Sequence, residues 1–338
     1  MAKSRYCIGI DLGGTFIKFG LLDQDRARSG TFQLPTPEGG ADPVIAQMVA
    51  GATRLMKKHR LAKADVVGVG VGAPGPMRIS EGIIIAMPNI PGIENCPMGR
   101  LVGQKLGIPA VLENDANAAG YGEYLCGAGK GGGDMVLLTL GTGIGGGIVI
   151  DGKVVHGAHE IGAEIGHLIV EPNGEPCGCG QCGCLEAYAS ASNLARYAIS
   201  RLDRAKKLRT SLRAIYERRK KLNKKRKKEQ KQEELNMADV NAARKAGDAL
   251  AAEVWDRGAY YLALGCVSIS RLLDPDLIVL VGGMTKAGSD LIRPVTEHYR
   301  RLHWVLTEPK TKIVIGKLGN DAGMVGAAGV AWAAFGAK

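Results

Sequence analysis

Two stretches of the chain share one pattern, in which apolar segments flank a loop of glycine and threonine. Residues 6–23 (YCIGIDLGGTFIKFGLLD) alternate around a Gly-Gly-Thr turn, and residues 136–155 (VLLTLGTGIGGGIVIDGKVV) repeat the design about 130 residues later. Apolar alternation on both sides of a glycine turn is typical of β-hairpins. The repetition predicts two related lobes.

Strands and helices alternate through the rest of the chain. The predicted elements are a helix at 43–58, a buried strand at 65–71, a Pro/Gly-rich loop region at 73–98, a strand at 110–113, helices at 185–200 and 241–273, a buried strand at 277–281 and a C-terminal helix at 321–335. This alternation predicts an α/β fold with a parallel component in each lobe.

Length and composition support two folded lobes. At 338 residues the chain exceeds what one hydrophobic core usually organises. Hydrophobic residues make up 46% and charged residues 23%, as in folded soluble proteins. The N-terminus reaches Asp11 without the apolar run of a signal peptide, and the uncharged stretches are shorter than the ~20 residues of a membrane span. We therefore expect a cytoplasmic protein with no membrane partner.

The net charge of +11 comes from one segment. Residues 201–231 hold sixteen Lys or Arg and three acidic residues, a local net charge of +13, which leaves −2 for the rest of the chain. Such a charge suggests nucleic-acid binding, but Tyr216 is the only aromatic residue in the segment. Because long charged helices are commonly just solvated, we expect an exposed helical excursion and no nucleic-acid partner.

The second glycine loop matches a dinucleotide-binding pattern without its structural context. Gly141, Gly143 and Gly146 spell GxGxxG, but a strand follows them, so the helix N-terminus that holds a pyrophosphate is missing. This argues against a dehydrogenase. The two hairpin turns can instead present backbone N–H groups and the hydroxyls of Thr15 and Thr142 to a chain of phosphates.

Two aspartates follow predicted strands. Asp11 ends the first strand, where a carboxylate would repel phosphate directly, so its expected role is to hold Mg²⁺ through water. Asp115 follows the strand at 110–113, at the edge where α/β enzymes place their chemistry. It is either the base that takes a hydroxyl proton during phosphoryl transfer or the cap of a helix that begins near Ala116.

Four of the eight cysteines lie between Cys177 and Cys184. In a reducing compartment such a cluster indicates a metal site before disulfides. Zinc takes four nitrogen or sulfur ligands in a tetrahedron, and thiolates this close in sequence can surround one ion only where glycines allow sharp bends. Gly178, Gly180 and Gly183 provide such positions.

Together these motifs resemble the ROK family, which includes sugar kinases and transcription repressors. The two hairpins resemble the phosphate loops of the actin, hexokinase and heat-shock chaperone superfamily, and residues 138–166 resemble the ROK signature. The similarity extends through DLGGTFIK, ENDANAA, HEIGAEIGH, CGCGQCGCLE and LIVLVGG. It implies a two-lobed actin-like ATPase (ribonuclease H-like) fold. The small lobe would be residues 1–115, completed by a helix at 325–338, and the larger lobe residues 116–324, with a zinc knuckle at 167–184 and the basic excursion at 201–231.

The resemblance also implies three sets of site residues. The sugar-binding set is Gly75, Asn89, Asn114, Asp115, Glu164, His167 and Glu186, with Asp115 as the catalytic base. The nucleotide-binding set is Asp11, Gly13, Gly14, Thr15, Lys18, Gly141, Thr142, Gly143, Gly282 and Gly283, the last two beside the adenosine. The zinc-binding set is His167, Cys177, Cys179 and Cys184, whereas Cys182 falls on a variable position.

The activity implied by the resemblance is phosphorylation of a hexose by ATP, with Mg²⁺ and one structural zinc. Glucose is the first choice because the sugar-binding set resembles that of bacterial glucokinases. Kinases of fructose, mannose, allose and N-acetylmannosamine share most of this set, and polyphosphate is an alternative donor. A non-catalytic, sugar-responsive regulator is the other interpretation, although we expect no helix-turn-helix module before the first hairpin. We expect a homodimer or a higher homo-oligomer.

Overall fold

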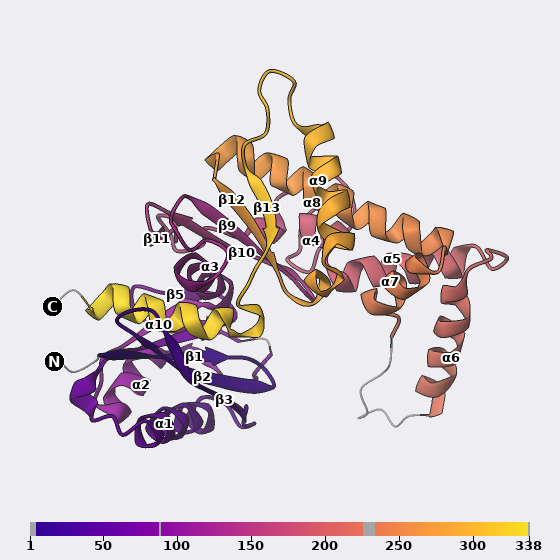
Figure 1. Ribbon diagram of the computed structural model, residues 1–338. Coiled ribbons are helices and arrows are strands. Elements are labelled where there is room, and N and C mark those ends of the chain that lie inside the picture. Colours follow the sequence, from indigo (N-terminus) through magenta and orange to yellow (C-terminus); the bar gives the residue numbers. More distant parts are fainter. Residues whose placement is uncertain (1–4, 88, 226–233, 337–338) are drawn as a thin grey trace. The chain divides into compact units, whose positions relative to one another are not determined.

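The computed structural model describes residues 5–87, 89–225 and 234–336 (Figure 1). By their contacts the residues group into two compact units. The first unit comprises Met1–Leu137, Gly146–Ala163 and Gly316–Lys338, and the second comprises Leu138–Gly145 and Glu164–Ile315. Residues 116–137, 146–163 and 316–324 thus group with the first unit, whereas we expected them in the larger lobe from the sequence.

The first unit is built on a five-stranded sheet with the strand order β3-β2-β1-β4-β8. The strands are β1 (Tyr6–Leu12), β2 (Phe16–Asp23), β3 (Arg28–Pro35), β4 (Val66–Ala73) and β8 (Ala110–Asn114). β1 and β2 are antiparallel, and the N–H of Gly13 donates to the carbonyl of Phe16 at 3.0 Å to close their turn. β1, β4 and β8 are parallel. The hairpin predicted at residues 6–23 is confirmed.

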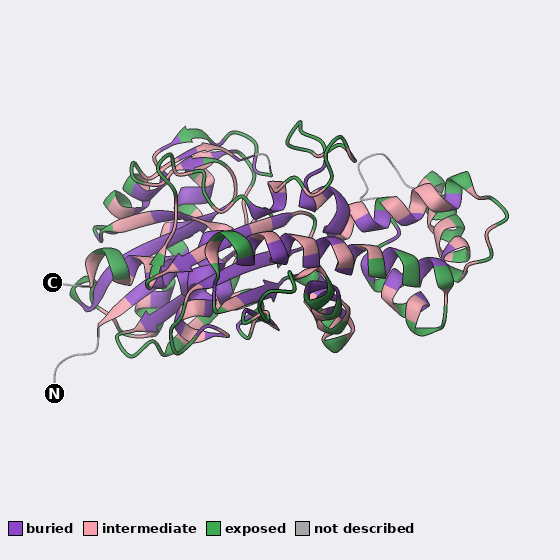
Figure 2. Ribbon diagram, turned by 90° about the horizontal axis from the view of Figure 1, so that it is seen from above, coloured by how far each residue is buried: buried purple, intermediate pink, exposed green. Residues whose placement is uncertain are grey.

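Helices cover both faces of this sheet. α1 (Ala41–Lys58) and α2 (Met98–Leu106) pack with one face, and α10 (Ala322–Phe335) packs with the other and with α3 (Asp115–Cys126) (Figure 1). Successive side chains of a strand point to opposite faces, so β4 turns its valines to the core with α1 and its glycines to α10. The strands are mostly buried (Figure 2). The helix predicted at 321–335 is confirmed.

Glycine lets α10 lie directly on the sheet. A Cβ at Gly70 of β4 would lie 1.7 Å from the carbonyl oxygen of Ala327, and one at Gly9 of β1 would lie 2.0 Å from that of Met324. The backbone of α10 cannot simply move away from the sheet, because α10 is also packed on α3 through Gly326, whose Cβ would lie 1.5 Å from the carbonyl oxygen of Ala118. This close packing places α3 in the first unit.

Gly70→Ala is therefore expected to lower the free energy of unfolding by about 1–3 kcal/mol, because the new methyl group forces backbone apart. Gly72→Ala is the matched control on the same face of β4. Its Cβ would lie 3.4 Å from the nearest atom, the Cβ of Ala118, which is ordinary van der Waals contact. Chemical denaturation measures both variants, and equal losses of stability would contradict the packing argument.

The region predicted as loop at 73–98 holds a small antiparallel sheet, so that prediction was incomplete. Its strands are β5 (Met77–Arg78), β6 (Ile83–Ala86) and β7 (Glu94–Cys96). With two to four residues each, these strands are too short to show a period of two in the sequence.

A second five-stranded sheet has the order β11-β10-β9-β12-β13. The division between the two units passes through β9 (Met135–Leu140) and β10 (Ile144–Ile150). β11 (Lys153–Val154) pairs with β10, and β12 (Leu277–Val281) runs parallel to β13 (Lys312–Ile315). The strand-loop-strand pattern predicted at 136–155 and the buried strand predicted at 277–281 are confirmed.

Helices make up most of the second unit. They are α4 (Leu185–Ala189), α5 (Ala191–Arg204), α6 (Ser211–Lys225), α7 (Met237–Lys245), α8 (Ala249–Leu273) and α9 (Ser289–Leu302). Short 3₁₀ turns in the chain are η1 (Lys63–Asp65), η2 (Ile165–His167), η3 (Gly283–Ala287) and η4 (Gly319–Asp321).

Two helices predicted as continuous are each divided. Residues 185–200 form α4 and then α5, because Ser190 adopts an extended backbone and its hydroxyl caps α5. Residues 241–273 form α7 and α8, separated by Gly247 with φ 86° and restarted by the cap Asp248. Apolar periodicity continues across such breaks, so it did not reveal them.

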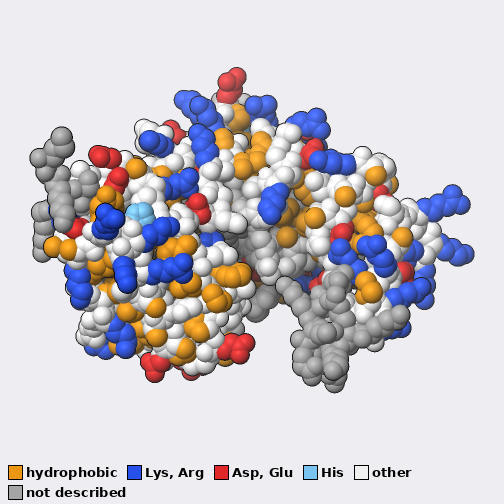
Figure 3. Space-filling view, turned by 60° about the horizontal axis from the view of Figure 1, so that its bottom comes forward, with side chains coloured by type: hydrophobic (Ala, Val, Ile, Leu, Met, Phe, Trp, Pro, Cys, Tyr) orange, Lys and Arg blue, Asp and Glu red, His pale blue; other side chains and the backbone are white. Residues whose placement is uncertain are grey.

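The basic segment is helical where the structure describes it. α6 carries exposed Arg218, Lys221 and Lys224, and Lys and Arg side chains stand out at the end of the second unit where α6 lies (Figure 3). Residues 226–231 of the predicted excursion lie outside the described residues. Within the described part of the chain, no helix has the length and apolar character needed to cross a membrane.

Candidate active site and metal centre

The first glycine loop, Gly13-Gly14-Thr15, joins β1 to β2. Thr15 is exposed, and its carbonyl accepts a hydrogen bond from the N–H of Thr36 at 2.9 Å. Beside the loop, Lys18 Nζ lies 3.3 Å from Asp11 Oδ2 and donates to the carbonyl of Asn320 at 2.8 Å. Burial raises the pKa of the Asp11 carboxyl, and the charge of Lys18 opposes this rise. Asp11 and Lys18 are thus a partly buried ion pair at the base of the loop.

The N-cap of α3 is Asn114 and not Asp115. Asn114 Oδ1 accepts hydrogen bonds from the N–H groups of Ala116 at 2.9 Å and Asn117 at 3.2 Å. Asp115 is the first helical residue and is partly exposed, and its Oδ1 also accepts from Ala116 at 2.8 Å. Since Asn114 supplies the standard cap, capping alone does not account for an acidic residue at 115.

A buried acid directly precedes this turn. Glu113 Oε1 accepts hydrogen bonds from the N–H of Asn114 at 2.9 Å and from Asn117 Nδ2 at 3.1 Å. Glu113 Oε2 lies 2.7 Å from His156 Nε2. The hydrogen bond to Glu113 raises the pKa of His156, burial opposes that rise, and the charges of Glu113 and Glu160 add to it. We had not singled out Glu113 or His156 from the sequence, although a carboxylate inside an apolar strand indicates a buried partner.

Two further residues of the predicted sugar-binding set lie in the first unit. Asn89 is exposed. It lies beside the first glycine loop, since a Cβ built at Gly14 would lie 3.5 Å from the Cβ of Asn89. Gly75 follows β4 with φ 101°, and a Cβ there would lie 2.4 Å from the carbonyl oxygen of Ala86. Gly75 is therefore required by the local backbone, whatever it does for a ligand.

The second glycine loop, Gly141-Thr142-Gly143, lies in the second unit and is linked to Glu186. The Glu186 carboxylate accepts a hydrogen bond from the N–H of Ile144 at 2.8 Å, and a Cβ at Gly143 would lie 2.3 Å from it. Gly282 has φ 100° and lies against the backbone of Leu140. Thr142 and Gly283 are exposed.

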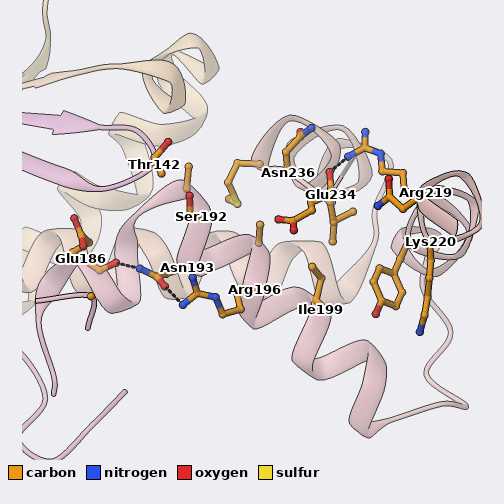
Figure 4. Close-up of a pocket in the computed structure, with 17 residues that line it drawn as sticks. Thr142, Glu186, Ser192, Asn193, Arg196, Ile199, Arg219, Lys220, Glu234 and Asn236 are labelled. Atoms are coloured by element: carbon orange, nitrogen blue, oxygen red, sulfur yellow. Dashed lines mark hydrogen bonds between the residues drawn. The ribbon is translucent and has the colours of Figure 1, made fainter. Parts of the chain in front are cut away.

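A cavity of about 1350 Å³ opens beside the second glycine loop (Figure 4). Thr142 lies at one end, and the other walls come from the start of α5, from α6 and from the segment leading into α7. Among the described residues that line it are three cationic side chains, Arg196, Arg219 and Lys220, and the polar pair Ser192 and Asn193. Gly282 and Gly283 are not among them, and Ser192, Asn193 and Arg196 had no signal in the sequence beyond an ordinary helix start.

The start of α5 is fixed by side chains that reach back toward Glu186. Asn193 Nδ2 donates to the carbonyl of Glu186 at 2.8 Å, and Arg196 donates to Asn193 Oδ1 at 2.7 Å (Figure 4). At the far end, Arg219 pairs with Asp239 at 2.6 Å and also donates to the carbonyl of Glu234. Hydrogen-bonded polar side chains therefore fix both ends of the cavity, while part of its wall is apolar.

The four predicted metal ligands come together in the second unit. The ligand atoms of His167, Cys177, Cys179 and Cys184 all lie within 4.8 Å of one another. His167 belongs to η2, which Glu164 precedes, and its N–H donates to the Glu164 carbonyl at 3.0 Å. The four side chains are therefore close enough together to hold one ion.

The donor set fits a zinc ion. A tetrahedral ion with Zn–S bonds of ~2.3 Å holds two sulfurs about 3.8 Å apart. Cys179 Sγ lies 3.7 Å from Cys184 Sγ, and Cys177 Sγ lies 3.7 Å from His167 Nδ1. All eight cysteines are free, and Cys182 is exposed and outside the cluster.

Backbone geometry explains how the knuckle folds. Gly180 and Gly183 have φ values of 92° and 83°, which favour glycine, and a Cβ at Gly183 would lie 2.0 Å from the carbonyl oxygen of Glu171. Gly178 is not among the positive-φ residues and has open space around it. Gly178 lies in the turn that the N–H of Gly180 closes by donating to the carbonyl of Cys177 at 3.1 Å, so all three glycines lie at bends, but only Gly180 and Gly183 have the positive φ that favours glycine.

The chain is similar to known proteins along nearly its whole length. The family model described as "ROK family" matches residues 7–334. A glucokinase of Halalkalibacterium halodurans is 36% identical over 326 residues, which cover 96% of this chain and 94% of that protein.

Two solved structures are also similar. A ROK hexokinase from Thermus thermophilus has a TM-score of 0.81 and 31% identity, covering 96% of each chain. A ROK family glucokinase from Streptomyces griseus, in complex with glucose and AMPPNP, has a TM-score of 0.74 and 32% identity, covering 96% of this chain and 98% of that one. The chain therefore belongs to the ROK family and has the actin-like ATPase fold of its sugar kinases.

Proposed function

We propose that this protein transfers the γ-phosphoryl group of ATP to a hexose, and that glucose is the preferred acceptor. The observation that carries the proposal is the similarity to a glucokinase along 96% of the chain. The similar structure from S. griseus holds glucose together with AMPPNP. Glucose 6-phosphate is the proposed product.

Asp115 is the proposed general base. It directly follows β8, is partly exposed, and begins a helix whose cap is supplied by Asn114. Phosphoryl transfer asks for alignment and for a carboxylate that accepts the hydroxyl proton as the bond to phosphorus forms. Asn114 Oδ1 is used by the cap, so its amide Nδ2 is the group proposed to bond to a sugar hydroxyl.

The nucleotide is proposed to bind through both glycine loops. The backbone N–H groups and Thr hydroxyls of residues 13–15 and 141–143 suit phosphate oxygens, and Lys18 adds a positive charge beside the first loop. Gly282 and Gly283 are the proposed neighbours of the adenosine. The cavity beside Thr142 carries both basic and acidic side chains and is proposed to adjoin the phosphate-binding part of the second loop. Asp11 is proposed to hold Mg²⁺ through water, where the metal would neutralise charge on the phosphates.

The metal cluster is proposed to be a structural zinc site that orders sugar-binding side chains. His167 is a ligand through Nδ1, which leaves Nε2 for a sugar hydroxyl, and Glu164 and Glu186 flank the cluster in sequence. Side chains that hydrogen-bond to metal ligands orient those ligands, and their substitution weakens metal binding. Gly75 and Asn89 complete the proposed sugar contacts. A cytoplasmic location is proposed as well, where a reducing environment keeps cysteine thiols available to a metal.

A coupled assay over glucose, mannose, fructose, allose and N-acetylmannosamine tests the proposal, with ATP or polyphosphate as the donor and with or without Mg²⁺. We expect the highest kcat/KM for glucose with ATP, and no turnover without Mg²⁺. A higher kcat/KM for another hexose than for glucose would change the proposed substrate but not the proposed kinase activity. Sugar binding by calorimetry with no phosphorylated product from either donor would contradict the kinase and favour a regulator.

A further inference from the structure

We propose that Glu113 and His156 form a positioning pair that holds the turn bearing Asp115 in its working geometry. The proposal rests on the proposed role of Asp115 as the base. Neither residue is proposed to touch the sugar or the nucleotide. Both lie in the first unit, 43 residues apart in sequence, and are joined by a 2.7 Å contact between Glu113 Oε2 and His156 Nε2.

Glu113 divides its two oxygens between the turn and the histidine. Oε1 accepts hydrogen bonds from the backbone N–H of Asn114 at 2.9 Å and from Asn117 Nδ2 at 3.1 Å. It is thus bonded to the residue before Asp115 and to a residue in the first turn of α3. Oε2 is left for His156. The side chain of Glu113 is 1% exposed, so water cannot replace these partners.

Burial makes the histidine necessary. An ionised carboxylate in a buried position costs several kcal/mol unless it is paired and fully hydrogen-bonded. Nε2 of His156, which carries a proton in the imidazolium and in one neutral tautomer, is the ring nitrogen that the structure places on Glu113 Oε2 at 2.7 Å. With it, Glu113 remains an acceptor and both bonds to the turn are charge-assisted, which makes them about twice as strong as neutral ones.

The loop that carries His156 is itself held in place. The carbonyl of His156 accepts from the N–H of Gly162 at 2.8 Å, which closes the loop at residues 156–162. Glu160 in the same loop accepts from the N–H of Ser80 at 2.9 Å. The histidine is therefore presented to Glu113 from a loop that is tied at two points, as a positioning group requires.

Catalysis is sensitive to such support. A displacement of about 1 Å of a reacting group can cost on the order of 100-fold in rate. Loss of the pair leaves the Asn114 cap on α3 intact, since the cap uses Asn114 Oδ1 and not Glu113. We therefore expect loss of the pair to lower the rate of the chemical step more than it lowers substrate binding.

The test compares His156→Leu, His156→Gln and Glu113→Gln with the unaltered protein in full kinetic assays. His156→Leu should lower kcat by about tenfold or more and change the KM for glucose and ATP less than about threefold. His156→Gln should recover most of the loss, because its amide N–H can still donate to Glu113. Glu113→Gln should lower kcat similarly, and the double variant Glu113→Gln with His156→Leu should fall no further than the lower single variant.

His298→Leu is the matched control. His298 Nε2 also lies 2.7 Å from a carboxylate oxygen, Asp256 Oδ1, in the second unit, but that carboxylate is exposed. It should leave kcat unchanged, even where it lowers the melting temperature. A purely structural role for His156 would give the same outcome, with a lower melting temperature and an unchanged kcat.

The outcomes separate this proposal from the proposed function. If Asp115→Asn is inactive while His156→Leu and Glu113→Gln keep the kcat of the unaltered protein, the positioning pair is refuted and the kinase stands. If Asp115→Asn remains active, the base assignment fails and the pair has nothing to position. Should His156→Leu fail to fold, the kcat values of Glu113→Gln and His156→Gln decide the matter.

Discussion

Asp115→Asn is expected to lower kcat by about 10² to 10⁴-fold, the typical contribution of a general base. In terms of the barrier this corresponds to about 3–5 kcal/mol. An amide cannot accept the hydroxyl proton, so the attacking oxygen would have to lose it to solvent. The KM values should change far less, because the amide keeps the shape and one acceptor atom of the carboxylate.

The same variant is expected to fold normally. The cap of α3 is Asn114, and the remaining Oδ1 of an asparagine at 115 can still accept from the N–H of Ala116. Asn114→Ala is a control for stability alone, since it removes the cap, which should cost about 1 kcal/mol of stability, and also removes a proposed sugar contact. Thermal denaturation with single-turnover kinetics measures both effects. Substantial turnover in folded Asp115→Asn would refute the role of Asp115.

Sequence patterns predicted elements well where a local rule acts. The hairpin at residues 6–23 and the strand at 277–281 were found because apolar runs end at glycines, and both are present. A metal site was predicted because four cysteines fall within eight residues, whereas the choice of His167, Cys177, Cys179 and Cys184 as its ligands came from the resemblance to the ROK family.

The parts that were missed depend on contacts between distant residues. The link from Glu113 to His156 joins β8 to a loop 43 residues later, and nothing local to either residue names the other. The sequence alone also does not decide whether Asn114 or Asp115 caps α3, because both residue types are good N-caps. Residues 116–137 fall in the first unit because glycines let α10 contact α3, which an interpretation of successive elements does not reveal.

Loss of the bound zinc is expected to lower the stability of the protein, the second largest effect that we predict. Two exposed cysteines allow a matched test. Cys179 belongs to the cluster and Cys182 does not, although they lie three residues apart. Cys179→Ser should abolish stoichiometric zinc, measured by plasma mass spectrometry, and lower the melting temperature. Cys182→Ser should keep one zinc per chain and an unchanged melting temperature.

The size of this effect follows from mass action, because an ion that binds only the folded protein stabilises it. At a free zinc concentration 100 times Kd, the ion adds about 2.7 kcal/mol to the free energy of unfolding. Removing zinc by chelation should therefore lower stability in the unaltered protein and in Cys182→Ser, and leave Cys179→Ser unchanged.

The KM for glucose should rise in parallel, because the ligand His167 and its neighbours Glu164 and Glu186 are the proposed sugar contacts. A zinc-free preparation with the stability and KM of the zinc-bound protein would contradict the metal site. If stability fell while the KM for glucose stayed constant, the zinc would be structural without ordering the sugar-binding side chains. That outcome would separate the fold of the knuckle from its proposed part in substrate recognition.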